Sequence, residues 1–286
     1  MKRGGIIGVL AVLGIGAAVL GGRRRGGSGD TYYDFEEEQI TGGGGDYVPP
    51  DVVGQGPFAS YADLPATMNE NQQLIRDMAE AVGIDPSWSM FFEATAKNES
   101  GFKILAGLGK PELFPPWAKP NTRASKRVQD NEAAAAAKAY ERNAGRLSKC
   151  GYPKSRYAFG SGGLFAMLPA NAILNAFKNT ELECMDPWEI FDPVVSFVCA
   201  VSFAKGLMNW TGYKKNPVLG NVRVGWGNPS KMGNPESMQK SRTSDRGFGS
   251  RLEELGYGRD RWSTPAVSLS GWDPVAAYYY LKQEFA

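Results

Sequence analysis

The chain has 286 residues, with 32 Lys and Arg against 30 Asp and Glu and no histidine, so its formal net charge at pH 7 is +2. This small excess gives no support for nucleic acid or an acidic substrate as a partner. The lack of histidine excludes a Ser-His-Asp triad, a Cys-His pair and the commonest zinc ligand, so acid/base chemistry must use carboxylates, Lys, Tyr or Cys. The length and the apolar fraction of 42% predict one sizeable domain plus appendages.

Residues 4–22 form an apolar run without a charge. At 1.5 Å per residue, a helix of this length just spans a hydrocarbon core of about 30 Å. A cleaved secretory signal also fits this pattern, but Arg23, Arg24 and Arg25 directly after the run favour a retained transmembrane anchor over residues 1–22. The orientation of the anchor stays open because basic residues flank both ends.

Residues 23–57 are rich in glycine and acidic side chains and end near Pro49-Pro50, so they cannot bury a core. We predict a flexible linker that, as a random coil of ~35 residues, reaches on the order of 30 Å.

From about residue 58 onward the pattern is predominantly helical. Apolar residues recur at helical spacing over 69–82, and Gly83 ends that helix. Pro86 is a suitable first residue for the next helix, and its inner face comprises Met90, Phe91, Ala94 and Thr95. Glu99 falls one turn beyond Thr95, so it is predicted to point into the fold, and Gly101 ends the helix.

An alanine-rich, charge-laced helical segment is predicted over 124–147, after a proline-containing stretch. We interpret it as an inserted helix with a solvated face. Trp117 and Trp88 are candidates for stacking against a sugar, although a buried position is the expectation for each.

A glycine-rich loop at 157–163 opens into a short apolar helix. Three interpretations are open: close backbone approach to a ligand, a turn into a core helix, and a phosphate-binding loop. No Gly-Lys-Ser/Thr follows the loop, so nucleotide binding is not indicated.

The three cysteines show no metal-ligand spacing. Cys199 lies in an apolar run and is predicted to be a buried structural thiol. A Cys150–Cys184 bridge is compatible with an oxidising compartment, but the sequence does not establish it.

Asn98-Glu99-Ser100-Gly101-Phe102 is the stretch with the clearest chemical potential. One interpretation is a solvated Glu near a helix C-terminus. The other is a proton-handling carboxyl, because burial raises the pKa of a Glu from ~4.3 toward about 6, where it can act as an acid near neutral pH. The inward placement of Glu99 favours the second.

Two motifs carry a resemblance to a known family. Glu99-Ser100 at a helix end, followed by Gly163-Leu164-Phe165 with Pro169 downstream, resembles the lysozyme-like soluble lytic transglycosylase superfamily, which includes goose-type lysozymes. The apolar stretch 193–210 is similar to the helix that follows these motifs, and Trp226 lies in a candidate third motif. The resemblance covers about residues 68–232 and implies a mainly α, lysozyme-like domain at 58–240.

The chain departs from the family pattern at three places. Ala166 stands where the family commonly has Gln, Trp226 replaces the usual Ala-Tyr-Asn, and the two leading motifs lie unusually far apart. Beyond the domain, an arginine-rich stretch and a tyrosine-containing segment are predicted to form a helical extension at 241–286 that packs on it.

The resemblance implies cleavage of peptidoglycan glycan strands between N-acetylmuramic acid and N-acetylglucosamine. Glu99 would be the catalytic acid and base, and a 1,6-anhydro ring would form, so that neither water nor a metal or other cofactor is needed. Six residues would contact substrate: Ser100, Gly162, Gly163, Leu164, Phe165 and Trp226.

Two alternatives are open. One is a membrane-anchored structural or interaction protein that has lost activity. The other is a goose-type hydrolase, which needs a second carboxylate, with Asp186, Asp192 and Asp245 as candidates. A wall-cleaving domain on a membrane anchor would suit a bacterial cell envelope or, slightly better, a phage particle that opens the wall during genome entry. Its partners would then include lipid, through residues 4–22, and other virion or envelope proteins.

Overall fold

The computed structural model describes residues 56–285, and this part of the chain is mainly helical, as predicted. The α-helices are α1 (Glu70–Ala81), α2 (Pro86–Glu99), α3 (Lys126–Arg142), α4 (Ala144–Leu147), α5 (Lys154–Tyr157), α6 (Pro169–Ala176), α7 (Pro193–Met208), α8 (Thr211–Lys214), α9 (Leu219–Gly227), α10 (Pro235–Thr243), α11 (Phe248–Glu254) and α12 (Pro274–Glu284). The strands are β1 (Ala106–Gly109), β2 (Lys119–Pro120) and β3 (Gly160–Gly162). Short 3-10 helices occupy Tyr61–Asp63, Pro111–Leu113, Ser148–Cys150, Glu181–Cys184, Pro187–Phe191, Pro229–Lys231 and Arg259–Ser263.

The predicted anchor at 1–22 and nearly all of the predicted linker at 23–57 lie outside the described residues. Within residues 56–285, no helix combines the length and the hydropathy that crossing a membrane requires.

The first two helices begin where local capping predicts. The Asn69 side chain accepts a hydrogen bond of 2.9 Å from the backbone N–H of Gln72 at the start of α1. Asp85 caps α2 in the same way through Ser87, and Pro86 occupies the first turn, where a missing N–H costs nothing. The helix α2 ends at Glu99, and Gly101 follows with φ of +63°, which favours glycine at the exit.

The strands form one small sheet in the order β2-β1-β3, with β1 parallel to β2 and antiparallel to β3. Gly107 on β1 pairs with Gly162 on β3. A Cβ at Gly107 would meet the Phe114 ring and one at Gly162 would meet the Phe191 ring, so aromatic side chains cover this face of the sheet. The helix α3 packs against both β1 and β3.

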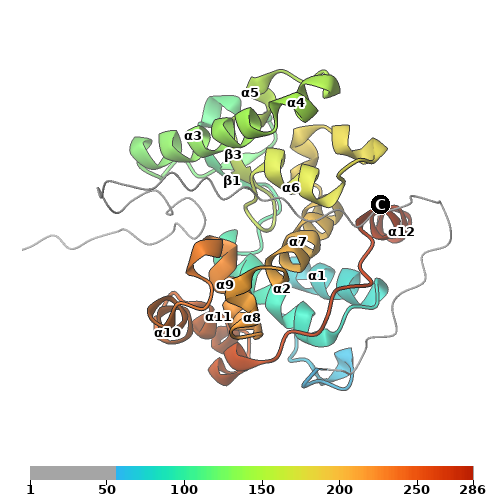
Figure 1. Cartoon of the computed structure of the whole chain (residues 1–286), viewed down its shortest axis with the longest axis vertical. Helices are drawn as coiled ribbons and strands as arrows, with labels where there is room; N and C mark the ends of the chain where they lie inside the picture. The colour runs from blue at the N-terminus through green and yellow to red at the C-terminus, as the bar shows by residue number, and fades with distance from the viewer. Residues whose placement is uncertain (1–55, 286) are drawn as a thin grey trace, which may run out of the picture.

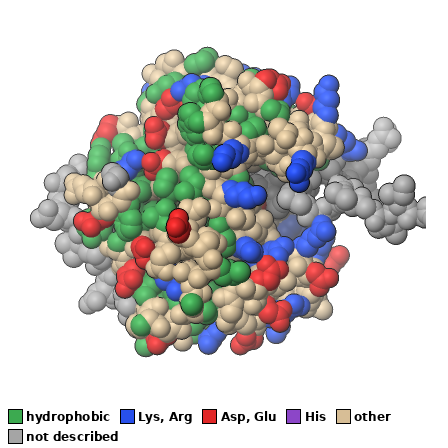
Figure 2. Space-filling view, turned by 180° about the vertical axis from the view of Figure 1, so that it is seen from behind, with side chains coloured by type: hydrophobic (Ala, Val, Ile, Leu, Met, Phe, Trp, Pro, Cys, Tyr) green, Lys and Arg blue, Asp and Glu red, His purple; other side chains and the backbone are tan. Residues whose placement is uncertain are grey.

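Figure 1 shows α3, α4, α5, α6 and the sheet in the upper part of the view, and α1, α2 and α8–α11 in the lower part, with α7 reaching between them. The chain passes from the lower to the upper group directly after α2, so Glu99 lies at their junction. On the face seen in Figure 2, several Lys and Arg side chains gather in the middle of the right half, while most Asp and Glu side chains lie nearer its edges.

The core is built around α2, whose residues 86–96 are all buried. The Trp88 and Phe91 rings lie 5.3 Å apart, and Phe92 contacts both Phe165 and Phe197. This aromatic packing fixes α2 on every side, as a helix without a solvated face requires.

The C-terminal stretch contributes to the same core. Phe248, Leu252 and Trp272 are buried in one cluster with α2, and the Trp88 indole donates a 2.9 Å hydrogen bond to the Val267 carbonyl. The helix α12 packs on α7. The boundary at residue 240 therefore remains an interpretation of the sequence, because packing is continuous across it.

A disulfide joins Cys150 to Cys184 and closes a stretch of 34 residues between the α4 region and the turn before α7. The third cysteine, Cys199 on α7, is buried and free, as predicted, and burial raises the pKa of its thiol.

Candidate active site

Glu99 is the last residue of α2, the helix after which the chain passes from one group of helices to the other. Its side chain is only 3% exposed, and its Oε1 accepts a hydrogen bond from Nη2 of Arg223 on α9. The Arg223 side chain is itself only 9% exposed. The inward orientation predicted for Glu99 is therefore confirmed, and its direct partner is a buried cation.

The protonation of Glu99 reflects a competition between burial and pairing. Desolvation is the largest influence on its pKa and raises it, whereas the charge of Arg223 and a 3.3 Å hydrogen bond from Asn98 lower it. The net result is a pKa above the ordinary 4.5. Such a carboxyl accepts and releases a proton closer to neutral pH than an exposed one.

A second buried carboxyl belongs to Glu132 on α3, which is 2% exposed. Desolvation raises the pKa of Glu132, the Ser161 side chain on β3 lowers it, and the charge of Glu99 raises it further. The two carboxyls are therefore electrostatically coupled. Sequence reasoning predicted a solvated face for this helix, which α3 has, but it did not identify the opposite face that buries Glu132.

A pattern in the sequence does mark the inner face of α3. Glu132, Ala136 and Ala139 recur at spacings of four and three, and all three are buried. Glu132 lies on the same helix face as these buried alanines, and this position distinguishes it from the solvated charged residues of α3.

The surroundings of Glu99 are polar but sparsely connected. Asn98 accepts a long 3.4 Å hydrogen bond from Nε of Arg251, which brings α11 to the site. The Nε of Arg223 is buried and has no hydrogen-bond partner among the described residues. An unsatisfied buried donor is costly, so this N–H is a position where an acceptor would bind favourably.

Ser100 caps its own helix. Its hydroxyl donates a 3.2 Å hydrogen bond to the Ala96 carbonyl, and the side chain is partly exposed. Phe102, two residues further on, has φ of +65°, which is unusual for a residue with a side chain. The turn after Glu99 is thus strained, as is common where a fold positions a functional group.

The glycine-rich loop does not leave room for a ligand on its Cβ side. A Cβ at Gly162 would lie 2.5 Å from the Phe191 ring, and one at Gly163, with φ of +80°, would lie 2.2 Å from the Ile190 carbonyl oxygen. Both glycines are therefore required by packing against Pro187–Phe191. The approach of their backbone to a sugar stays a prediction.

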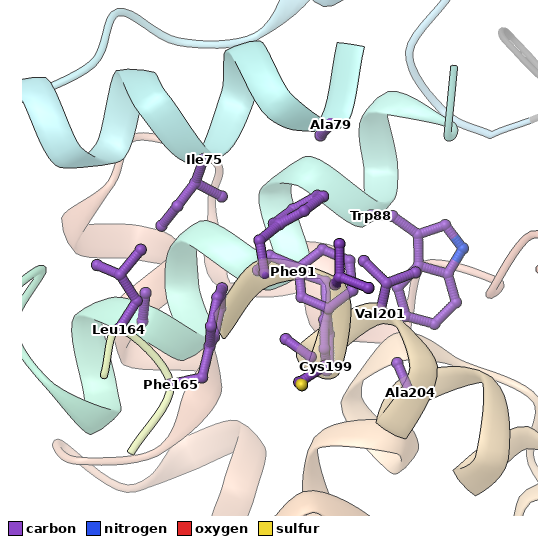
Figure 3. Close-up of a cluster of buried hydrophobic side chains, with 14 of the residues drawn as sticks. Ile75, Ala79, Trp88, Phe91, Leu164, Phe165, Cys199, Val201 and Ala204 are labelled. Atoms are coloured by element: carbon purple, nitrogen blue, oxygen red, sulfur yellow. The ribbon is translucent and has the colours of Figure 1, made fainter. Parts of the chain in front are cut away.

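Three further residues predicted to contact substrate have buried side chains. Leu164 and Phe165 are 0% exposed, and Figure 3 shows both side chains among those of Ile75, Phe91 and Cys199 in the core. Trp226 is 2% exposed and packs against Phe91, Phe165 and Phe203. These side chains pack in the core against α2 and are not exposed to solvent.

The aspartates considered as a second carboxylate have other roles. Asp186 binds Arg156 and caps the turn at Trp188, and Asp192 caps α7 and pairs with Lys282 at 2.7 Å. Asp245 is exposed. The carboxyl that is coupled to Glu99 is Glu132.

The two tryptophans behave differently from each other. Trp88 is fully buried, as expected, whereas Trp117 is 49% exposed and the expectation of burial is wrong. Its ring contacts Trp188 and Phe191, and the Arg156 guanidinium lies 3.2 Å above Trp188. This aromatic group lies on the Phe191 side of the sheet.

Another buried acid on α2, Glu93, is fully paired. Its carboxylate accepts hydrogen bonds from Gln72 at 2.6 Å, Arg76 at 3.0 Å, Ser89 at 3.0 Å and Tyr257 at 2.7 Å. This network joins α1, α2 and the C-terminal stretch, so we assign Glu93 a structural role. Glu99 accepts fewer hydrogen bonds, from Arg223 and Asn98.

An open hollow lined by Asn69, Glu70, Asn71, Gly101 and Phe102 adjoins the turn after Glu99, but neither buried carboxyl lines it. Within residues 56–285, no group of three or more Cys, Asp and Glu side chains is arranged to hold a metal ion.

Comparison with protein families, with curated proteins and with solved structures finds no match to this chain.

Proposed function

We propose that this chain is a lysozyme-like lytic transglycosylase that cleaves the glycan strands of peptidoglycan, with Glu99 as its catalytic acid and base. The observation that carries this proposal is the buried Glu99 carboxyl, with its raised pKa, at the C-terminal end of a core helix. The Glu99-Ser100 and Gly163-Leu164-Phe165 motifs support the same assignment.

The reaction begins with protonated Glu99. It donates its proton to the oxygen that bridges N-acetylmuramic acid and N-acetylglucosamine, and the bond between that oxygen and C1 of the muramyl residue breaks. The resulting Glu99 carboxylate takes the proton from the muramyl C6 hydroxyl, whose oxygen bonds to C1 and closes the 1,6-anhydro ring. The acid is regenerated and water is not consumed.

Two features support a location at the cell wall. The Cys150–Cys184 disulfide is typical of proteins that work outside the reducing cytosol. The apolar run 4–22 would tether the domain to a membrane through the linker, in a cell envelope or in a phage particle with other virion proteins.

Glu132 favours a second candidate of the same substrate class. A hydrolase needs a carboxylate that activates water, and Glu132 is the described carboxyl that is coupled to Glu99. The ion pair between Glu99 and Arg223 favours a third hypothesis, because a carboxylate that is paired with an arginine is not itself a proton donor. In that reading the domain binds or scaffolds without cleaving.

The test is release of soluble fragments from purified, dye-labelled peptidoglycan by the full-length chain. Glu99→Gln retains shape but cannot transfer a proton, so we expect a loss of release of about 10²-fold or more. Glu70→Gln, an exposed position on α1, is the matched control and is expected to release fragments at the parent rate. Equal release by the parent and Glu99→Gln would overturn the assignment of Glu99.

A further inference from the structure

The two oxygens of the Glu99 carboxyl have different surroundings. Oε1 accepts a hydrogen bond from Nη2 of Arg223 and a second one, of 3.3 Å, from Nδ2 of Asn98. Within residues 56–285, Oε2 accepts no hydrogen bond, and it is not one of the side-chain oxygens that are shut off from solvent without a partner. One oxygen of the carboxyl is therefore held by two donors, and the other is open.

Both donors are fixed by the fold. The Arg223 side chain lies on α9 and is only 9% exposed, so its guanidinium has little freedom to turn away. Asn98 precedes Glu99 on α2, and its Oδ1 accepts a 3.4 Å hydrogen bond from Nε of Arg251 on α11. This contact orients the amide with its Nδ2 toward Glu99. The orientation of the carboxyl is thus determined by contacts from three helices.

We propose that Arg223 and Asn98 hold Oε1 of Glu99 so that Oε2 carries the proton that is transferred to the glycan, which makes Arg223 a positioning residue of the reaction. This inference rests on the proposed glycan cleavage and adds to it the atom that donates the proton and the residue that orients it. Guanidinium and amide N–H groups donate and do not accept hydrogen bonds. A proton on Oε1 would therefore face two donors, whereas a proton on Oε2 faces none.

The ion pair with Arg223 is compatible with proton donation from Oε2. In the neutral carboxyl, Oε1 is the carbonyl oxygen and accepts both hydrogen bonds. When the proton leaves Oε2 for the bridging oxygen of the glycan, the bond between that oxygen and C1 breaks. The negative charge that develops on the carboxyl lies beside the guanidinium, which stabilises it. Oε2 then takes the proton of the muramyl C6 hydroxyl, and the neutral carboxyl is restored.

The charged groups around Glu99 come from several helices. Arg223 of α9 contacts the carboxyl, Arg251 of α11 reaches it through one intervening side chain, and Glu70 of α1 lines the hollow beside the following turn. Glu132 of α3 is influenced by the charge of Glu99. Among these described groups, Arg223 is the one whose charge lowers the pKa of Glu99, so its removal should raise that pKa.

The kinetic test is the pH profile of glycan release by full-length variants. In Arg223→Met the opposing charge is gone, so the alkaline limb of kcat/KM should move to higher pH by about one unit or more. At the optimum, kcat should fall about 10-fold or more, because the carboxyl is no longer held and its developing charge has no cation beside it. Arg223→Lys keeps a charged donor and should retain the parent limb. Arg242→Met removes an exposed arginine of α10 and is the matched control, expected to change neither the limb nor kcat.

A measurement without substrate tests the assignment of the proton to Oε2. Isotope-edited infrared spectra of the full-length chain with labelled Glu, at a pH that protonates Glu99, contain its carbonyl band, which is identified by its loss in Glu99→Gln. If Oε1 is the carbonyl oxygen, its two hydrogen bonds lower the frequency of this band. Arg223→Met should therefore move the band to a higher frequency, and Arg242→Met should leave it in place. Asn98→Ala should move it in the same direction by less.

The outcomes separate this inference from the proposed function. A band at the parent frequency in folded Arg223→Met, or in Asn98→Ala where Arg223→Met does not fold, would overturn the proposal even if Glu99 proves to be catalytic. A parent-like alkaline limb in folded Arg223→Met would overturn it as well. A shifted band together with equal glycan release by the parent and Glu99→Gln would contradict cleavage through Glu99 and leave the assignment of the proton to Oε2 standing.

Discussion

Arg223 on α9 donates a hydrogen bond to Glu99 on α2 across 124 residues of sequence, and both side chains are almost completely buried. The pair connects the C-terminal end of α2 to α9, whose Trp226 packs against Phe91 of α2. Its consequence is that the positive charge of Arg223 opposes the rise in the pKa of Glu99 that burial causes. Stability and reactivity at this site are therefore set by the same contact.

The Glu93 network predicts a large stability effect on the same helix. Arg76→Met leaves the Glu93 carboxylate buried without its cation, and removal of one partner of a buried pair costs about 3–5 kcal/mol. Tyr257→Phe removes the 2.7 Å hydrogen bond that the hydroxyl donates to Glu93 and the 3.0 Å hydrogen bond that it accepts from Arg76, and should cost about 1–3 kcal/mol. Urea denaturation of both variants measures the difference, and equal small losses would argue against a buried ion pair.

The glycine loop offers a prediction with an internal control. Gly163→Ala combines an unfavourable φ with a contact of 2.2 Å to the Ile190 carbonyl, so we expect destabilisation of at least about 3 kcal/mol. Gly145→Ala in α4 meets nothing within 4 Å and should stabilise the protein by about 0.5–1 kcal/mol. Thermal unfolding checks both, and a well-tolerated Gly163→Ala would show that the loop is not packed as described.

The disulfide predicts a third effect. Cys150→Ser with Cys184→Ser reopens a stretch of 34 residues, and the chain-entropy estimate for such a loop is about 3–4 kcal/mol. Adding reductant to the parent should lower its unfolding free energy by the same amount. Cys199→Ser is not a suitable control because that thiol is buried. An unfolding free energy of the parent that reductant does not change would contradict a stabilising disulfide.

The buried carboxyls also predict how stability depends on pH. Because the pKa of Glu132 is raised above 4.5 in the folded state, its stabilising contribution is complete below 4.5 and is lost as pH rises through the folded value. Glu132→Gln cannot ionise, so its unfolding free energy should gain on that of the parent as pH rises through this window.

Glu141 serves as the control of opposite sign. Lys154 lowers the pKa of this exposed carboxyl, so its contribution is present above 4.5 and is lost as pH falls. Glu141→Gln should therefore differ from the parent only toward neutral pH and in the reverse sense. Parallel curves for the parent and Glu132→Gln would show that Glu132 is not buried.

The sequence predicted those parts of the fold that depend on local patterns. Helical spacing and capping residues located α1 and α2, and the register after Thr95 turned Glu99 inward. Glu132 was not identified because its burial arises from packing of α3 against β1 and β3, which are distant in sequence and which no local window contains. The burial of Trp226 could not be predicted either, since an aromatic residue in a motif looks the same in sequence whether it lines a groove or fills the core.

The most direct test of the central claim is the mass of the glycan ends that the full-length chain releases from purified peptidoglycan, compared with those from Glu99→Gln. Lytic transglycosylation through Glu99 predicts 1,6-anhydromuramyl ends from the parent and none from the variant. Reducing ends, heavier by one water, would contradict transglycosylation and favour hydrolysis with Glu132 as the water-activating carboxylate. The absence of released glycan from both folded proteins would contradict catalysis altogether.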